Sequence, residues 1–145
     1  MVKPDKLQKY SLFGGLLEEQ IQQILPHMIE ESWEAGDDII VEDMPNDKIR
    51  FILEGRVAVL KHNITLSEFD KGNTFGEMEV LDVMPSTATI KALTPTKTIS
   101  VSNKGLREIY KTDIHSFSLI VMNLARDLSR RLRLMNDKAV ENSGG

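Results

Sequence analysis

The sequence of 145 residues contains no cysteine. A disulfide framework, a thiolate metal site and a cysteine nucleophile are therefore excluded. The three histidines, His27, His62 and His115, do not have the spacing of metal ligands. No serine, histidine and aspartate constellation and no pair of catalytic carboxylates stands out, so we expect neither an enzyme nor a metal site.

Long apolar runs are also absent. No stretch approaches the roughly 20 residues that a membrane span needs. The first residues lack the apolar core of a signal peptide, so we expect a cytoplasmic protein that does not insert into membranes. A length of 145 residues suits a single domain, and a net charge of −4 argues against general nucleic-acid binding.

Positive charge is concentrated near the C-terminus. Residues 104–138 hold eight lysines and arginines against four acids, which leaves ten against eighteen in the rest of the chain. Two interpretations remain open for this basic segment: a polar partner for the helix, or a solvated helix face.

The chain divides by its periodicity into a domain over residues 1–138 and a flexible tail over 139–145. Helical spacing predicts N-terminal helices over residues 6–30, broken at Gly14–Gly15 and ended near Pro26. Residues 31–103 contain many short β-rich runs between turns, at a spacing of about 8–12 residues. Such spacing predicts a sandwich, jelly roll or barrel. A two-residue hairpin loop is expected at His62–Asn63.

Residues 104–138 are expected to be helical again, with a cap at Asp113 or Ser116. Apolar residues then recur every three or four positions from Phe117 to Met135. This stripe could pack on the β body or pair with a second copy of the chain. Because its distal half would extend beyond the body, we expect a homodimer with a seam formed by Val121, Leu124, Leu128 and Leu132.

Residues 72–89 read as a strand end, a glycine turn, a very short helix and a new strand. Such a turn directs several backbone N–H groups into one space and is typical of an anion cradle. This cradle contains Glu79 and no arginine.

Two runs of residues resemble a known family. Phe75–Leu81 followed by Pro85–Ala92 resembles the phosphate-binding cassette of cyclic-nucleotide-binding domains, as found in catabolite-activator regulators and kinase regulatory subunits. Trp33–Asp37 and Phe51–Gly55 resemble the early strands of the same family. The resemblance implies a mainly β fold, a β-roll or double-stranded jelly roll with N-terminal helices and a long C-terminal helix. It also implies a cyclic nucleotide, cAMP or cGMP, as a possible ligand.

The resemblance also implies roles for individual residues. Gly76 would allow close approach of the backbone, and Glu77 would accept hydrogen bonds from the ribose 2′-hydroxyl. The amides of Met78 and Glu79 would face the phosphate, with Thr87 nearby.

One position departs from the family pattern, which places a phosphate-binding arginine directly after the proline. Here that residue is Ser86. Loss of an arginine–phosphate contact forfeits roughly 1.5–3 kcal/mol. Repulsion from Glu79 at about 5 Å would cost on the order of 1–3 kcal/mol more. Together these effects lower the expected affinity by about 10²–10⁴-fold. No other arginine is an obvious substitute; Arg50 and Arg56 on the neighbouring hairpin and Lys91 on the outgoing strand are the cations that could reach in.

The sequence therefore predicts a non-enzymatic regulatory or sensor domain with weak nucleotide affinity, whose ligand acts on the C-terminal helix. One alternative is a nucleotide-free module for dimerisation or protein interaction. Another is the sensor part of a longer DNA-binding regulator, because activator-type relatives continue into a helix-turn-helix beyond the position of Lys138. Since nothing here can act as a recognition helix, we expect no nucleic-acid binding by this chain alone.

Overall fold

A computed structural model gives the structure of residues 2–144. Helical elements cover both ends of the chain, and strands cover the middle. In chain order the elements are α1 (Pro4–Leu7), the 3-10 helix η1 (Ser11–Phe13), α2 (Glu18–Ile24), the 3-10 helix η2 (Leu25–His27), β1 (Ile29–Trp33), β2 (Asp38–Ile40), β3 (Lys48–Glu54), β4 (Arg56–Lys61), β5 (Ile64–Asp70), β6 (Thr74–Phe75), α3 (Glu77–Asp82), β7 (Thr89–Ala92), β8 (Thr96–Ser102), α4 (Asn103–Thr112) and α5 (Ile114–Gly144).

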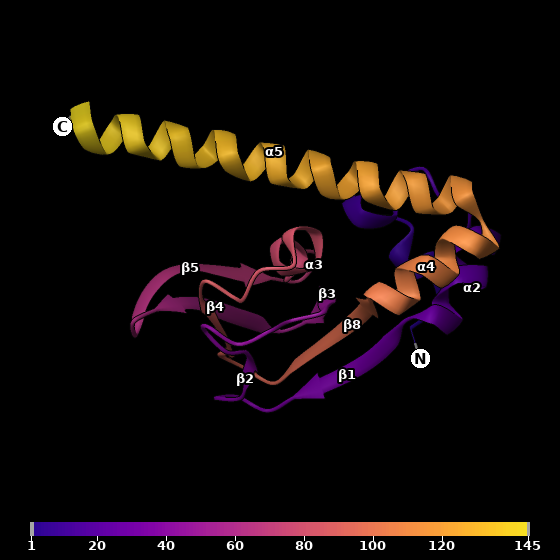
Figure 1. Cartoon of the computed structure of the whole chain (residues 1–145), viewed down its shortest axis with the longest axis horizontal. Helices are drawn as coiled ribbons and strands as arrows, with labels where there is room; N and C mark the ends of the chain where they lie inside the picture. Colours follow the sequence, from indigo (N-terminus) through magenta and orange to yellow (C-terminus); the bar gives the residue numbers. More distant parts are fainter. Residues whose placement is uncertain (1, 145) are drawn as a thin grey trace.

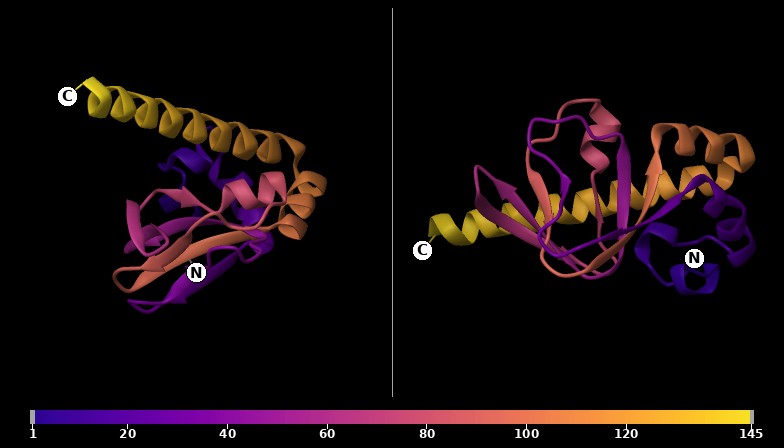
Figure 2. Two further views of the ribbon diagram at one scale, coloured as in Figure 1. Left: turned by 60° about the vertical axis from the view of Figure 1, so that its left-hand side comes forward. Right: turned by 90° about the horizontal axis from the view of Figure 1, so that it is seen from below.

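The eight strands form two antiparallel sheets of four strands each. One sheet has the order β1-β8-β3-β6, and the other has the order β2-β7-β4-β5. Ile52 and Phe75 of the first sheet meet Val57, Ile90 and other apolar residues of the second sheet in a shared buried cluster. The expected mainly β fold, a roll of two sheets flanked by helices, is therefore present (Figures 1 and 2).

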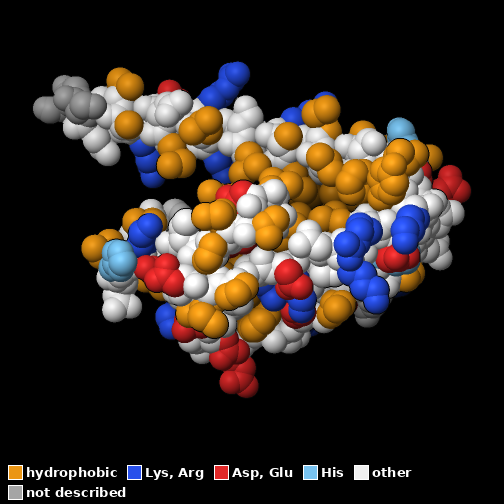
Figure 3. Space-filling model, viewed as in Figure 1, with side chains coloured by type: hydrophobic (Ala, Val, Ile, Leu, Met, Phe, Trp, Pro, Cys, Tyr) orange, Lys and Arg blue, Asp and Glu red, His pale blue; other side chains and the backbone are white. Residues whose placement is uncertain are grey.

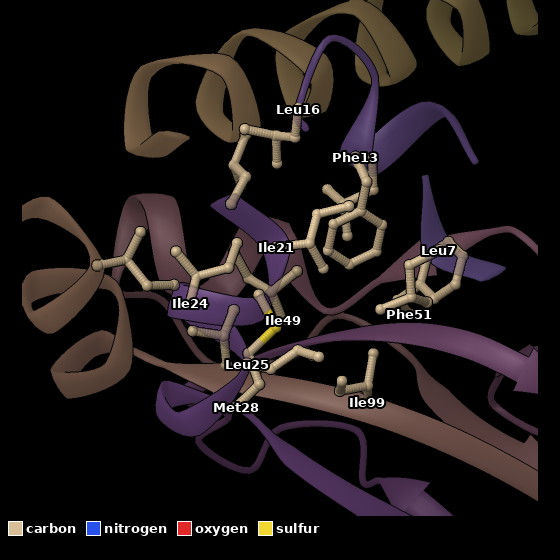
Figure 4. Close-up of a cluster of buried hydrophobic side chains, with 14 of the residues drawn as sticks. Leu7, Phe13, Leu16, Ile21, Ile24, Leu25, Met28, Ile49, Phe51 and Ile99 are labelled. Carbon is tan, nitrogen blue, oxygen red and sulfur yellow. The ribbon is translucent and has the colours of Figure 1, made fainter. Parts of the chain in front are cut away.

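A second and larger core lies between the first sheet and the helices. Phe51 and Ile99 pack from the strands against Phe13 and Ile21 of the N-terminal segment (Figure 4). Ile120 and Leu124 of α5 join the same cluster. The edge-on contact of Phe13 with Phe51, at 5.6 Å between ring centroids, fastens η1 to β3. This core fixes the first part of α5 on the body.

Helix α5 spans 31 residues and runs past the body in one straight piece (Figure 1). Its first part lies on the body, where hydrophobic side chains gather, and a hollow opens beneath its distal part (Figure 3). Residues 139–144 continue α5 as helix, and the flexibility expected for the tail 139–145, whose last residue lies outside the described residues, stays a prediction. Helix propagation is favourable once a helix has formed, and neither proline nor glycine interrupts α5 before Gly144.

Local turn chemistry behaves as the sequence predicts. His62 and Asn63 connect β4 to β5 and both have positive φ, 50° and 64°. This is the backbone that a two-residue hairpin loop requires. The N-terminal helical region ends earlier than the expected residue 30, because β1 begins at Ile29 and pairs with β8.

Candidate functional site

The candidate site is the cassette formed by β6, Gly76, α3 and the loop that leads to β7. Gly76 has φ +83°, and a Cβ atom there would lie 2.7 Å from the carbonyl oxygen of Lys48. Only glycine tolerates both conditions. The side-chain amide of Asn46 donates to the carbonyl oxygens of Lys48, at 2.9 Å, and Gly76, at 3.1 Å. This bridge ties the start of the cassette to β3.

Arg50, one of the candidate substitutes for the missing arginine, is committed elsewhere. It is 6% exposed, and its Nε donates to Oε1 of Glu31 at 3.0 Å. Its Nη1 donates to Oδ1 of Asn46, and its guanidinium lies 5.5 Å from the centroid of the Trp33 ring. Arg50 therefore supports the cassette through Asn46.

The other two candidates also have acidic partners. Arg56 lies 3.5 Å from Glu68, and Lys91 lies 2.8 Å from Asp38. Lys91 also donates to the carbonyl oxygen of Gly36 at 3.4 Å. In the described contacts, each of these three cations is engaged with an acidic partner.

An arginine from α5 is the cation that reaches the cassette. Arg131 Nη1 donates to Oε1 of Glu77 at 2.5 Å, and Nη2 donates to the carbonyl oxygen of Thr74. The guanidinium also lies 4.9 Å from the centroid of the Phe69 ring, a cation–π contact with β5. Arg131 thereby joins α5 to three neighbouring elements, β5, β6 and α3.

Sequence reasoning missed this role, because it considered only a polar partner or a solvated helix face for the basic residues 104–138. The structure corrects that interpretation. Arg131 follows Leu124 by seven residues and therefore lies on nearly the same side of the helix. This spacing directs Arg131 toward the body only because Leu124 packs in the core, which the sequence did not show.

Glu77 is buried, with 3% of its surface exposed. Burial raises the pKa of its carboxyl group, and the charge and hydrogen bond of Arg131 oppose that rise. The negative charge of Glu79 adds a smaller upward contribution to the pKa of Glu77. Arg131 is thus the described cation that compensates the buried carboxylate.

The remaining predicted cassette residues lie at different depths. Met78 is exposed and Glu79 is half-buried. Ser86 is 3% exposed, and its hydroxyl donates to the carbonyl oxygen of Ala88 at 2.7 Å. The Ser86 N–H donates to the carbonyl oxygen of Met44 at 3.0 Å. Thr87 is exposed. Both donors of Ser86 are therefore used within the protein.

A groove of about 310 Å³ lies beneath α5, next to the cassette. Its wall is formed by Ser11, Gly72, Asn73, Asp127, Arg130, Arg131 and Leu134. Arg130 pairs with Asp127 on its own helix, and Asp127 also accepts a hydrogen bond from Ser11 at 3.4 Å. The neighbouring arginines Arg130 and Arg131 thus have different partners, one on the helix and one in the cassette.

A sequence model of the cyclic nucleotide-binding domain matches residues 30–113, more than half of the chain. This chain belongs to the cyclic nucleotide-binding domain family. The resemblance predicted from the cassette residues is therefore confirmed. The match begins at the second residue of β1, includes the strands up to β8 and the whole cassette, and ends at Asp113, before the helix that carries Arg131.

Relatives of this cyclic nucleotide-binding domain include kinases and bacterial regulators. Human cGMP-dependent protein kinase 2 is 28% identical over 134 residues, which is 92% of this chain and 18% of the kinase. The cyclic AMP receptor protein of Thermus thermophilus is 28% identical over 127 residues, 84% of this chain and 57% of the receptor. The chain thus spans about a fifth of the kinase relatives that it matches.

The fold agrees with a solved member of the family. The crystal structure of a cyclic nucleotide-binding domain from Methylobacillus flagellatus superimposes with a TM-score of 0.85 at 24% identity, covering 95% of this chain and 80% of that one. This likeness supports the assignment of the two sheets, the flanking helices and the long C-terminal helix to the jelly roll of the family.

The residues expected at a dimer seam are placed unequally on the domain. Leu124 is 4% exposed and packs in the larger core. Val121 and Leu132 are 39% and 58% exposed, and Leu128 is half-buried. Within residues 2–144 no helix is long and apolar enough to cross a membrane, and no group of acidic or histidine side chains has the arrangement of a metal site.

Proposed function

We propose that this chain is a non-enzymatic regulatory domain whose cassette ligand acts on α5 through Arg131. The observation that carries the proposal is the hydrogen bond from Arg131 to Glu77, the residue that family resemblance assigns to the ribose hydroxyl. A ligand hydroxyl on Glu77 shares the carboxylate with Arg131. Occupancy of the cassette therefore changes the contact that holds the distal half of α5.

The affinity of this site for cyclic nucleotides is expected to be weak. The arginine that the family pattern places here, which forms a charge-assisted bond to phosphate, is replaced by Ser86. The hydroxyl and the backbone N–H of Ser86 already have partners within the protein. The missing bond alone corresponds to a loss of about 10- to 100-fold in affinity. With repulsion from Glu79 included the expected loss is about 10²–10⁴-fold, so a site of micromolar affinity would bind cAMP or cGMP near millimolar concentration.

Hydrogen exchange tests the coupling. Addition of millimolar cAMP or cGMP is expected to alter amide protection in residues 127–142 of the wild-type protein. The same change is expected in Arg130→Gln, because Arg130 pairs with Asp127 on its own helix. It should disappear in Arg131→Gln, which removes the bond to Glu77. Unchanged protection in all three proteins, together with no heat of binding, would contradict the proposal.

A second function is favoured by the exposed apolar residues on distal α5. Leu132 and Met135 are 58% and 66% exposed, and they lie on nearly the same side of the helix. We infer that this stripe pairs with a second copy, so that the domain dimerises whether or not it holds a nucleotide. A further candidate function, supported by the similarity to a bacterial receptor, is the sensor part of a longer DNA-binding regulator.

A further inference from the structure

Ser86, which stands where the family pattern has its phosphate-binding arginine, offers no free donor to an anionic group. The hydroxyl of Ser86 donates to the carbonyl oxygen of Ala88 at 2.7 Å. The backbone N–H of Ser86 donates to the carbonyl oxygen of Met44 at 3.0 Å. The Ser86 carbonyl oxygen in turn accepts from the N–H of Asp43 at 2.7 Å. A phosphate at this position would have to break bonds that hold the loop before β7 against the loop after β2.

The charges around the cassette also disfavour an anion. The positive charge of Arg131 is matched by Glu77, and Glu79 adds a second carboxylate two residues further along. These three side chains carry a net charge of −1 when all are ionised. A phosphate placed among them would be repelled. A neutral ligand avoids this repulsion.

The same groups suit a hydroxyl donor. A carboxylate has two oxygens with about four acceptor sites, and the described bond from Arg131 uses one oxygen of Glu77. Arg131 and the backbone N–H of Glu77 itself hold this carboxylate in position. Vicinal hydroxyls, as in a ribose ring, can donate to it without requiring a cation elsewhere in the cassette.

We infer that the cassette binds an uncharged molecule with vicinal hydroxyls, of the nucleoside class, in preference to a cyclic phosphate. This inference rests on the proposed function, because it takes the cassette to be the ligand site. It explains how a site without its phosphate partner retains a buried and compensated glutamate. Recognition then depends on Glu77 and Arg131, and the position of Ser86 has no part in it.

Calorimetry with adenosine, 2′-deoxyadenosine and cAMP tests the inference. Adenosine is expected to bind at least about 10-fold more tightly than cAMP, and 2′-deoxyadenosine to lose about 10-fold relative to adenosine. If cAMP binds as tightly as adenosine or more tightly, the inference fails while the proposed function stands. If none of the three binds at millimolar concentration, both fail.

Two charge variants sharpen the test. Ser86→Arg is expected to raise the affinity for cAMP by about 10- to 100-fold and to leave that for adenosine unchanged. Ile64→Arg, at an exposed position of β5 outside the cassette, is the control for added positive charge and should change neither affinity more than about 2-fold. If Ser86→Arg does not fold, Glu79→Gln provides the second measurement, because removal of one carboxylate should favour cAMP relative to adenosine. An adenosine preference that is the same in Glu79→Gln and the wild type would overturn the electrostatic argument.

Discussion

Glu77 places a carboxylate in a buried position, and Arg131 supplies the nearby positive charge. Their bond of 2.5 Å joins residues that are 54 positions apart in the chain. Removal of one member of a buried pair usually costs 3–5 kcal/mol, because the other charge stays uncompensated. Since 28% of the Arg131 side chain is exposed to water, we expect Arg131→Gln to cost less, about 2–3 kcal/mol.

The pH dependence of stability tests the environment of Glu77. Its pKa in the folded state is raised above the ordinary value of 4.5 by burial. Folding therefore favours the protonated carboxyl, and stability falls as the pH rises from 4.5 through the folded pKa. In Glu77→Gln this decrease should be absent, so the unfolding free energy of the variant relative to wild type should increase over that range. Denaturant titrations at several pH values measure the difference.

Arg131→Gln is the matched control for that titration. Without the guanidinium, nothing from Arg131 opposes the rise that burial causes in the pKa of Glu77. The stability of this variant should therefore fall more steeply with increasing pH than that of wild type. Parallel curves for wild type, Glu77→Gln and Arg131→Gln would show that Glu77 ionises as freely in the folded protein as in the unfolded chain.

The cassette residues differ in how far the sequence could predict them. Gly76 and Glu77 are predictable because they lie in one short motif with a fixed spacing to the proline. The partner of Glu77 is not, because Arg131 reaches it only through the path of α5 over the body. The hydrogen bonds of Ser86 within the protein could not be predicted from the sequence either, because they depend on the path of the loop that contains Met44.

At the scale of elements, local chemistry sets the positions where helices and strands begin and end. Asp113 lies between α4 and α5 in an extended conformation, with φ −156°. Its carboxylate accepts from the hydroxyl of Ser116 at 2.7 Å and from the N–H of His115 at 3.1 Å. The bond from the His115 N–H is that of a helix N-cap, the Ser116 hydroxyl adds a side-chain bond to the same carboxylate, and the sequence predicted a cap at Asp113 or Ser116. The structure assigns the cap to Asp113, with Ser116 as its donor.

Replacement of this cap is expected to weaken the start of α5. Asp113→Ala removes both acceptors and should lower the unfolding free energy by about 1 kcal/mol at neutral pH. The hydrogen bond from Ser116 is the main cause that lowers the pKa of Asp113 below its ordinary value of 3.8. The stability that ionised Asp113 contributes is therefore present above pH 3.8 and is lost as the pH falls through the pKa of Asp113 in the folded protein. Thermal unfolding at neutral and acidic pH measures the effect.

Asp113→Asn separates capping from charge. Asparagine keeps an acceptor for the His115 N–H and caps nearly as well as aspartate, so this variant should retain most of the stability. It should also lack the loss of stability at low pH. A destabilisation by Asp113→Asn as large as that by Asp113→Ala would mean that the charge, and not the cap, is the important feature.

For the whole molecule, the sequence predicted the class of fold and not its topology. Strand spacing and turn residues predict a roll, because each turn depends on a few adjacent residues. The orders β1-β8-β3-β6 and β2-β7-β4-β5 depend on pairings such as Ile29 with Ser100. Such pairings join distant parts of the chain, and no local pattern encodes them. The burial of Leu124 in the monomer core likewise could not be predicted without knowing where α5 lies on the body.

The distal half of α5 allows a test of dimerisation that leaves the fold of the monomer intact. Leu132 is exposed and lies beyond the part of α5 that packs in the core. Leu132→Asp should therefore lower the fraction of dimer at a given concentration without changing the secondary structure. Its side chain would place a charge within an apolar helix pair, which typically costs at least several kcal/mol when it is fully buried. Light scattering across a range of concentrations measures the change in mass.

Leu134→Asp is the control, because Leu134 has a similar exposure of 65% and lies two residues, or about 200°, further around the helix. It should leave the dimer unchanged if the seam follows Val121, Leu128 and Leu132. A monomeric wild type at high concentration would exclude the seam altogether. Dissociation by Leu134→Asp and not by Leu132→Asp would move it to the other side of α5, where Leu134 and Arg130 face the groove beside Arg131. Dimerisation would then compete directly with the contact between α5 and the cassette, and ligand binding would depend on protein concentration.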